Sequence, residues 1–305
     1  MSAPQTTTVA EDNSAPPWTK LKSSDLPWYT DDVEGQLSPS IRAQFETYSA
    51  IPADDVIPHI RRVRATLWNI RAYPCTGLFV FLTPFVASHS ALPRIVSYVQ
   101  TVPDGKVLDV GCYIGHDLRA LQFAGVPQGA LHGLDVLPFW EQGWELFNDR
   151  EKFDLSGRVV VGDVLDFSAG SEASRLLDGR MDVVWSSAVL HQFAWDKQVV
   201  ACKRLLRYTK GRGSFVFGCL AGSCKAAGDI EMERMTGGGV KRAEEPFKHD
   251  KESFERLWGV VGEEVGMGLE VEVRWTEWGD WGCEVERARF MGEDMGVLEF
   301  TVRIV

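Results

Sequence analysis

The stretch that most restricts the possible fold is residues 106–117, which read KVLDVGCYIGHD. Apolar residues surround one acid, Asp109, and two glycines follow it, Gly111 and Gly115. A short buried strand brings Asp109 to its carboxyl end, and the glycines then let the backbone turn tightly into a helix. This pattern predicts a ligand-binding turn at the carboxyl edge of a parallel sheet.

From residue 106 onward, short apolar segments alternate with amphipathic ones, which is typical of strands flanked by helices. We therefore predict an α/β fold, with a Rossmann-like, mostly parallel sheet of seven strands and helices on both faces. The predicted strands are 106–110, 131–135, 158–161, 181–185, 213–219, 269–275 and 297–304. The predicted helices are 115–124, 138–150, 171–178, 195–208 and 249–265.

The chain before this domain has a different pattern. Residues 26–102 show interrupted helical periodicity without strand alternation, so we predict an N-terminal helical cap that acts as a substrate lid. Residues 1–25 are rich in Ser, Thr, Pro and Ala, which indicates a flexible tail. The Rossmann-like domain then takes residues 103–305, with a Gly-rich irregular insert at 220–248.

Composition excludes several classes of function. The net charge is −11 and no Lys/Arg cluster occurs, which argues against a nucleic-acid partner. The N-terminus lacks the pattern of a signal peptide, and the longest apolar run, 78–87, is too short for membrane insertion. Six cysteines without a CxxC pair or zinc spacing predict reduced thiols, a cytoplasmic location and no metal site. The oligomeric state stays open, a homodimer included.

The spacing of the glycine loop distinguishes between nucleotide ligands. A pyrophosphate needs Gly-x-Gly-x-x-Gly, whereas here Tyr113 stands where the middle glycine would be. Asp109 inside the loop also suits a ligand with an ammonium group better than one with phosphates. Both features favour S-adenosylmethionine over NAD as the cofactor.

Two further acids follow predicted strands. Asp135 ends the second strand, where a carboxylate can accept hydrogen bonds from the hydroxyls of a ribose. Asp163 follows the third strand, where it can accept a hydrogen bond from an adenine amino group. A single Asp at a strand end usually caps a turn. Three acids at three successive strand ends, after a loop of this form, indicate an adenosyl site instead.

These motifs resemble those of the class I S-adenosylmethionine-dependent methyltransferases, over residues 106–219, with Tyr113 as the departure. The resemblance implies that the glycine loop holds the methionine tail, that Asp135 binds the ribose and that Asp163 with Val164 binds the adenine. The implied cofactor-binding residues are Asp109, Gly111, Cys112, Gly115, Asp135, Val136, Asp163, Val164 and Ser186.

A narrower resemblance rests on three segments. RAYPCTGLF at 71–79, the DxGCxxGxD form of the loop and AVLHQFAWD at 188–196 are similar to fungal methyltransferases of secondary metabolism. Enzymes that methyl-esterify meroterpenoid carboxylic acids are among these. The resemblance implies a hydrophobic small-molecule substrate.

The segment 186–193 after the fourth strand supplies the candidate catalytic residues, His191 and Gln192. His191 can take a proton from a hydroxyl or donate a hydrogen bond to a substrate carboxylate, and Gln192 can do the latter. Equally, His191 can cap the next helix or form a hydrogen bond with the backbone. Tyr73 on the cap side and Trp278 on the opposite side are predicted, with His191 and Gln192, to contact the substrate.

We therefore predict methyl transfer to an oxygen of a hydrophobic small molecule, with a carboxylate favoured because it is anionic at neutral pH and needs no base. A phenol would instead use His191 as a base. The alternatives are a non-catalytic regulator or a cyclase built on the same fold, and an NAD-dependent oxidoreductase, which the loop spacing disfavours. The sequence determines neither the acceptor nor the regiochemistry.

Overall fold

The computed structural model describes residues 24–230 and 244–305. The predicted flexible tail, apart from its last two residues, and the middle of the predicted insert therefore lie outside the described residues. In the part of the insert that is described, β6 (Gly228–Asp229) pairs antiparallel with β7 (Phe247–Lys248).

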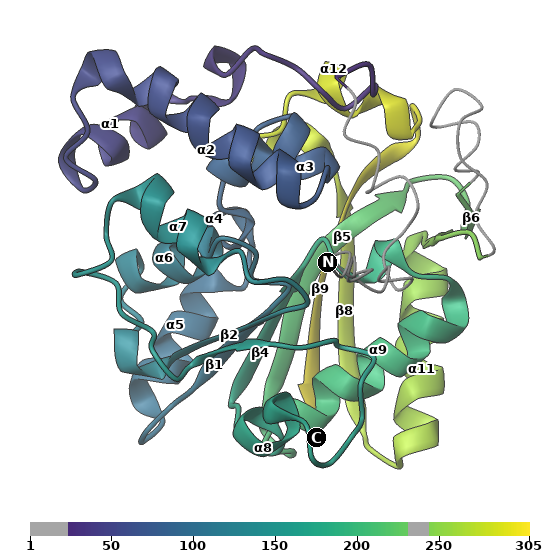
Figure 1. The fold of residues 1–305 in the computed structure, drawn as a ribbon. Coiled ribbons are helices and arrows are strands. Elements are labelled where there is room, and N and C mark those ends of the chain that lie inside the picture. The colour runs from purple at the N-terminus through teal and green to yellow at the C-terminus, as the bar shows by residue number, and fades with distance from the viewer. Residues whose placement is uncertain (1–23, 231–243) are drawn as a thin grey trace, which may run out of the picture.

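The predicted seven-stranded, mostly parallel sheet is confirmed. Its strand order is β3-β2-β1-β4-β5-β9-β8, with β1 to β5 parallel and β9 antiparallel between β5 and β8. Such a sheet places the carboxyl ends of its parallel strands along one edge (Figure 1). The strands are β1 (Val107–Val110), β2 (Leu131–Asp135), β3 (Val159–Val161), β4 (Val183–Ser187), β5 (Phe215–Ser223), β8 (Leu269–Thr276) and β9 (Met295–Ile304).

Helices cover both faces of the sheet, as predicted (Figure 1). All four residues of β1 are buried, because a parallel strand in the middle of such a sheet packs on both sides. One face carries α5 (Leu92–Thr101), α6 (His116–Phe123) and α7 (Trp140–Phe147). The other carries α8 (Glu172–Leu177), α9 (Trp195–Tyr208) and α11 (Lys251–Val265).

Several elements begin or end at other residues than predicted, and β4, β5 and α7 differ most. β4 has the predicted length but lies two residues further along the chain, and β5 runs on to Ser223 because it pairs with β9 as far as Met295. α7 is shorter than the predicted 138–150, because Asn148 adopts a left-handed conformation (φ +46°) that ends the helix. The strand and helix periodicities were correct, whereas their ends depend on pairing partners and caps.

Helices from the region before β1 lie across the carboxyl edge of the sheet (Figure 1). Hydrogen bonds fasten them to the end of α7: His59 Nε2 lies 2.9 Å from the Leu146 carbonyl oxygen, and Tyr48 donates its hydroxyl to Asp149 at 2.8 Å. Beside them lies the short helix α12 (Val285–Ala288) near the other end of the chain. The N-terminal helices are α1 (Pro39–Thr47), α2 (Val56–Ile70), α3 (Pro74–Gly77) and α4 (Phe85–Ser88).

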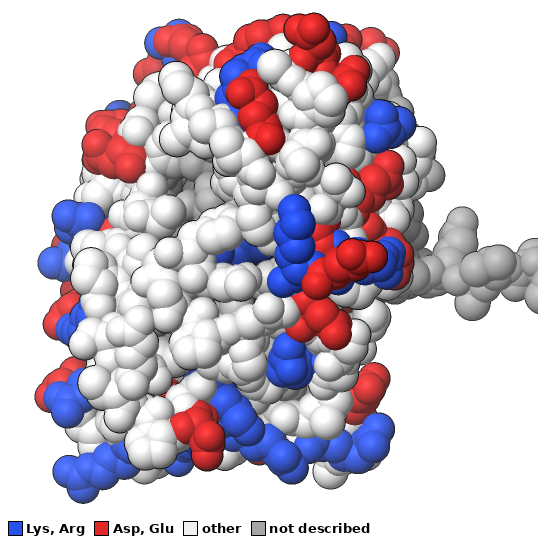
Figure 2. Space-filling view, turned by 90° about the vertical axis from the view of Figure 1, so that its left-hand side faces the viewer, with Lys and Arg blue, Asp and Glu red and all other residues white. Residues whose placement is uncertain are grey.

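The surface of this assembly is mixed in charge. On the face shown in Figure 2, acidic and basic side chains lie around a broad uncharged middle. Within the described ranges, no helix has the length and apolar character needed to cross a membrane. The same residues hold no group of three or more His, Cys, Asp or Glu side chains placed to bind a metal ion.

Candidate functional site

The site lies where the strand order reverses. β1 has β2 on one side and β4 on the other, so the loops that follow β1 and β4 leave the sheet side by side. In register, Val110 at the end of β1 faces both Leu134 and Ser186. An open α/β sheet binds ligands at this kind of switch point.

The loop after β1 turns through three left-handed residues. Gly111 has φ +80°, Tyr113 φ +49° and Gly115 φ +71°, and Gly115 is the N-cap of α6. Left-handed conformation costs an L-residue roughly 1–2 kcal/mol and a glycine almost nothing. Tyr113 therefore stands in a glycine-like conformation, which agrees with its place in the sequence where a nucleotide-binding loop has a glycine.

Neighbouring elements press closely on this loop. A Cβ added at Gly111 would lie 2.3 Å from Cγ2 of Val189, in the segment after β4. One added at Gly115 would lie 2.4 Å from the ring of Trp140. Any side chain at these two glycines would have to displace the loop or its neighbours.

A buried ion pair next to the glycine loop holds part of its backbone in place. Arg119, on α6, donates to both carboxylate oxygens of Asp149, at 2.6 and 2.8 Å, and both side chains are almost fully buried. The same guanidinium donates to the carbonyl oxygens of Ile114 and Gly115, at 2.8 and 3.1 Å. The charge of Arg119 is thus used to hold backbone atoms of the glycine loop in place.

Acids gather around the loop. Asp109 is 2% exposed, and its burial, together with the nearby charges of Asp117 and Asp135, raises its pKa well above the usual range. Asp117 accepts hydrogen bonds from the backbone N–H of Val86 and from the indole N–H of Trp185. Asp117 therefore ties α6 to the cap and to β4, whereas Asp109 lies in a buried, negatively charged region.

Asp135 is partly exposed at the end of β2. Its carboxylate accepts the backbone N–H of Tyr113 at 2.8 Å and that of Leu137 at 3.0 Å. Burial raises its pKa to about 6, against the opposing effect of these hydrogen bonds. The carboxylate is consequently oriented by the glycine loop itself.

Three predicted cofactor contacts, Val136, Asp163 and Val164, follow β2 and β3 at the carboxyl ends of these strands. Val136 is 42% exposed, and Val164 is buried in the core. Asp163 accepts the backbone N–H of Leu165 at 2.8 Å, so at least one of its oxygens has the turn-forming role that a strand-end Asp often takes.

The segment after β4 also bends sharply. Ala188 has φ +56°, and its carbonyl accepts the side-chain amide of Gln192 at 2.8 Å. His191 lies in the short 3-10 helix Leu190–Gln192, and its Nδ1 accepts the backbone N–H of Ala221 at 3.1 Å. Burial lowers the pKa of His191 to about 4, so its ring is neutral at pH 7. Ser186 is 2% exposed, and its hydroxyl has no hydrogen-bond partner among the described residues.

The other two predicted substrate contacts, Tyr73 and Trp278, lie in different surroundings. Tyr73, the N-cap of α3, is half-buried with its ring against those of Tyr113 and Phe139. Trp278 is 8% exposed and packs in the core cluster that also holds Trp281. The structure therefore brings Tyr73 to the glycine loop, whereas Trp278 lies mostly inside the protein.

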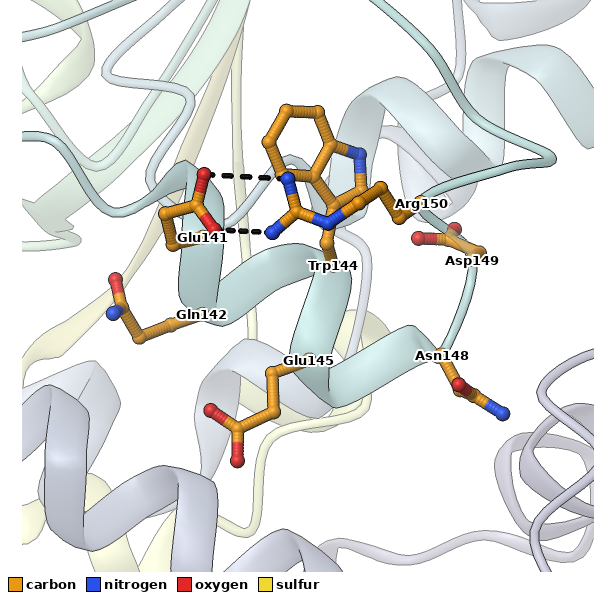
Figure 3. Close-up of a pocket in the computed structure, with 7 residues that line it drawn as sticks. All are labelled: Glu141, Gln142, Trp144, Glu145, Asn148, Asp149 and Arg150. Atoms are coloured by element: carbon orange, nitrogen blue, oxygen red, sulfur yellow. Dashed lines mark hydrogen bonds and ion pairs between the residues drawn. The ribbon is translucent and has the colours of Figure 1, made fainter.

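A pocket of about 280 Å³ lies beside the loop, and Cys112, Tyr113 and Asp135 line it together with the residues of β3. A second hollow of about 330 Å³ lies along α7 and is lined by polar side chains (Figure 3). An ion pair between Glu141 and Arg150 closes one side of that hollow. Only the first pocket shares residues with the predicted site.

Sequence reasoning missed several residues that build this site. Tyr113 was noted only as a departure, although its hydroxyl lies 2.8 Å from that of Thr76 in α3. Arg119 and Asp149 were not singled out at all. The available signal for Arg119 was a charged residue among the apolar positions of α6. No local pattern identifies Asp149 as the partner of Arg119, or Thr76 as the partner of Tyr113.

Comparison with known proteins gives relatives along most of the chain. A family model described as the meroterpenoid methyltransferase N-terminal domain matches residues 28–82. O-methyltransferase phiE, from a fungal species (strain ATCC 74256), is 34% identical over 281 residues, which are 91% of this chain and 87% of phiE. O-methyltransferase atr3 of Stereocaulon alpinum is 33% identical over 85% of this chain and 71% of atr3. The Asnovolin E/Chermesin D methyltransferase nvfJ of Aspergillus novofumigatus is 30% identical over 76% of this chain and 79% of nvfJ.

Proposed function

The chain belongs to the fungal S-adenosylmethionine-dependent O-methyltransferases, and on this basis we propose that it methylates a carboxylate oxygen of a hydrophobic small molecule, giving a methyl ester. The acceptor we infer is an acid of fungal secondary metabolism, and specifically a meroterpenoid acid. The similarity of residues 28–82 to the meroterpenoid methyltransferase N-terminal domain supports this class of acceptor.

The residues at the glycine loop fit S-adenosylmethionine. Its ammonium and sulfonium groups are cationic, and Asp109 lies buried beside two other acids, where a cation would stabilise the ionised form. Asp135 presents an oriented carboxylate for ribose hydroxyls, with Cys112 beside it in the pocket. We infer that Gly111 and Gly115 shape the loop around the methionine tail, that the unpartnered hydroxyl of Ser186 bonds the same ligand, and that Val136, Asp163 and Val164 hold the adenine.

The observation that favours a carboxylate acceptor is the hydrogen bond on His191. Because Nδ1 accepts the N–H of Ala221, the neutral ring carries its proton on Nε2. Its pKa of about 4 keeps it in this state at neutral pH. His191 therefore offers a donor and no free lone pair, so it suits the orientation of an anionic oxygen and cannot act as the base that a phenol needs.

The mechanism that follows relies on positioning. When bound, S-adenosylmethionine supplies an activated methyl group on its sulfonium. A carboxylic acid with a pKa of about 4 is already ionised at pH 7, so its oxygen attacks without proton removal. We propose that His191 Nε2–H and the Gln192 side chain orient this carboxylate, while the aromatic side of the cap, including Tyr73, excludes water. Trp278 contributes to the opposite wall mainly through packing.

The test is turnover by the purified protein. It is incubated with methyl-labelled S-adenosylmethionine and matched acceptors, namely a terpenoid carboxylic acid, the corresponding alcohol and a phenol of similar size. Mass spectrometry should detect a labelled methyl ester and neither ether. A phenol ether as the main product would refute the carboxylate assignment, and no product from an extract of fungal metabolites would favour the non-catalytic alternative.

The pH profile and a substitution at His191 separate the two roles of the ring. With S-adenosylmethionine at saturation, kcat/KM for a carboxylic acid should stay flat from about pH 6 to about pH 9, because both His191 and the acceptor have pKa values near 4. His191→Gln keeps a side-chain N–H donor and should retain most activity, whereas His191→Leu removes it and should lose roughly tenfold. A loss of about 10²-fold or more in both variants would instead identify a base.

A further inference from the structure

We propose that Tyr113 is a positioning residue that couples the helical cap to the cofactor-binding acid Asp135. The inference rests on the proposed function, because it concerns how the same site is held in its binding geometry. Tyr113 is the one residue of the glycine loop whose backbone bonds a predicted ligand contact while its side chain reaches the cap.

The backbone of Tyr113 sets the orientation of Asp135. Its N–H donates to Asp135 Oδ2 at 2.8 Å, while Leu137 N–H bonds the other oxygen at 3.0 Å. Tyr113 makes this bond from within a tight turn, in which its own backbone is left-handed, with φ +49°. A shift of Tyr113 would therefore rotate or release the carboxylate that we assign to the ribose.

The side chain of Tyr113 is held by the cap. Its hydroxyl lies 2.8 Å from Oγ1 of Thr76, and both residues are buried, at 7% and 0% exposure. The ring packs edge-on against Phe139, with ring centroids 4.5 Å apart, and lies near those of Tyr73 and Phe81. Two hydroxyls that satisfy each other away from water fix the distance between α3 and the loop.

The cap end of this connection is itself tightly packed. Gly77, next to Thr76, lies so close to Trp28 that a Cβ would come within 2.1 Å of the Trp28 carbonyl oxygen. Trp28 is fully buried and donates its indole N–H to the Ala72 carbonyl at 3.3 Å. A displacement of α3 therefore cannot be absorbed locally and is transmitted to Tyr113.

Packing alone does not account for the residue at this position. Glycine would adopt the left-handed conformation without strain, whereas in tyrosine the strain offsets part of the packing energy of the side chain. What tyrosine adds is the anchor to Thr76. Cofactor affinity should consequently depend on a hydroxyl pair in which neither hydroxyl need contact the cofactor.

The experiment measures binding of S-adenosylhomocysteine by calorimetry, together with urea unfolding, for a set of matched variants. Tyr113→Phe and Thr76→Val each delete one hydroxyl and keep the shape, and Thr76→Ser keeps the hydroxyl. Tyr98→Phe is the control, because Tyr98 also donates its hydroxyl in a single bond, to the Gly213 carbonyl at 3.1 Å, far from the loop.

We expect Tyr113→Phe and Thr76→Val each to weaken the affinity roughly fivefold, the value of one net hydrogen bond. The double variant should have an affinity no lower than that of the single variant that binds more weakly. Thr76→Ser should bind with the affinity of the native protein. The KM for the cofactor should rise with little change in kcat. Tyr98→Phe should lose comparable stability and keep its affinity.

The contrary results are distinct. Unchanged affinity in both hydroxyl deletions, with a loss of stability alone, would make the pair purely structural and overturn the inference. Tyr113→Gly is a second discriminator, because it relaxes the backbone and removes the anchor; native or better affinity in that variant would also overturn it. If the native protein binds no S-adenosylhomocysteine, the proposed function fails, and the inference fails with it.

Discussion

The buried ion pair between Arg119 and Asp149 offers the sharpest test of how the glycine loop is supported. Arg119 is 1% exposed and makes four hydrogen bonds, two to Asp149 and two to loop carbonyls. Removing one partner of a buried pair leaves an uncompensated charge, which costs about 3–5 kcal/mol. This is a large share of a typical folding free energy of roughly 5–15 kcal/mol.

Three variants separate stability from binding. Asp149→Asn and Arg119→Met should each lower the free energy of unfolding by about 3–5 kcal/mol. The double variant Arg119→Met/Asp149→Asn combines the two single changes, removes both charges and should be more stable than either single one. Both variants that lack Arg119 leave the carbonyls of Ile114 and Gly115 without their donor, so S-adenosylhomocysteine should bind weakly even to the more stable double variant.

The assays are urea unfolding, read by tryptophan fluorescence, and calorimetric titration at a temperature where all three variants are folded. A cost below about 1 kcal/mol for Asp149→Asn would mean that the pair behaves as an exposed one. A double variant whose loss equals the sum of the two single losses would show no coupling between the charges. Native affinity in the double variant would refute the role of Arg119 in holding the loop.

Three further predictions concern single positions. Gly111→Ala should lose roughly 1–3 kcal/mol more stability than Gly157→Ala in thermal unfolding, because both are left-handed but only the former meets Val189, 2.3 Å from its Cβ. Because the folded pKa of Asp135 is about 6, S-adenosylhomocysteine affinity should fall roughly tenfold from about pH 7.5 to about pH 5. Its effect on folding has the opposite sign, since an acid with a raised folded pKa adds stability as the pH falls through 6; Asp135→Asn should remove the share of both trends that Asp135 contributes. Ser186→Ala removes a buried, unpartnered hydroxyl and should raise the unfolding free energy by about 1 kcal/mol while weakening cofactor binding.

The fold could be predicted from the sequence because its strands are short, apolar and regularly spaced. β1 and β2 occur where the periodicity placed them, and α9 has the predicted bounds Trp195–Tyr208. The end of β5 at Ser223 could not be predicted, because it depends on pairing with β9, which lies about 75 residues further along the chain. Local patterns determine that an element exists, whereas distant partners determine where it ends.

The site divides in the same way. The acids and glycines of the proposed site could be predicted from the sequence, because Asp109, Gly111 and Asp135 stand in a recognisable strand-and-turn pattern. The direction of a hydrogen bond could not be predicted in this way. The assignment of His191 as base or donor rests on one N–H, that of Ala221. That residue is 30 positions away and is brought to His191 only by the packing of β5 beside β4.

Tyr113 shows why a departure from a motif can be more informative than agreement with it. Comparison with a glycine motif identifies the position as unusual but supplies no reason, because the reason is Thr76, in a short helix before the sheet begins. The hydrogen bond between the two hydroxyls offers a reason for the left-handed strain at Tyr113, because only a tyrosine at this position connects the loop to Thr76. On our proposals the cap would have two tasks, because the helices proposed to enclose the substrate also contact the loop proposed to bind the cofactor. In that arrangement, we expect a change in the cap to alter cofactor affinity as well as acceptor choice, so that the two properties would not vary independently.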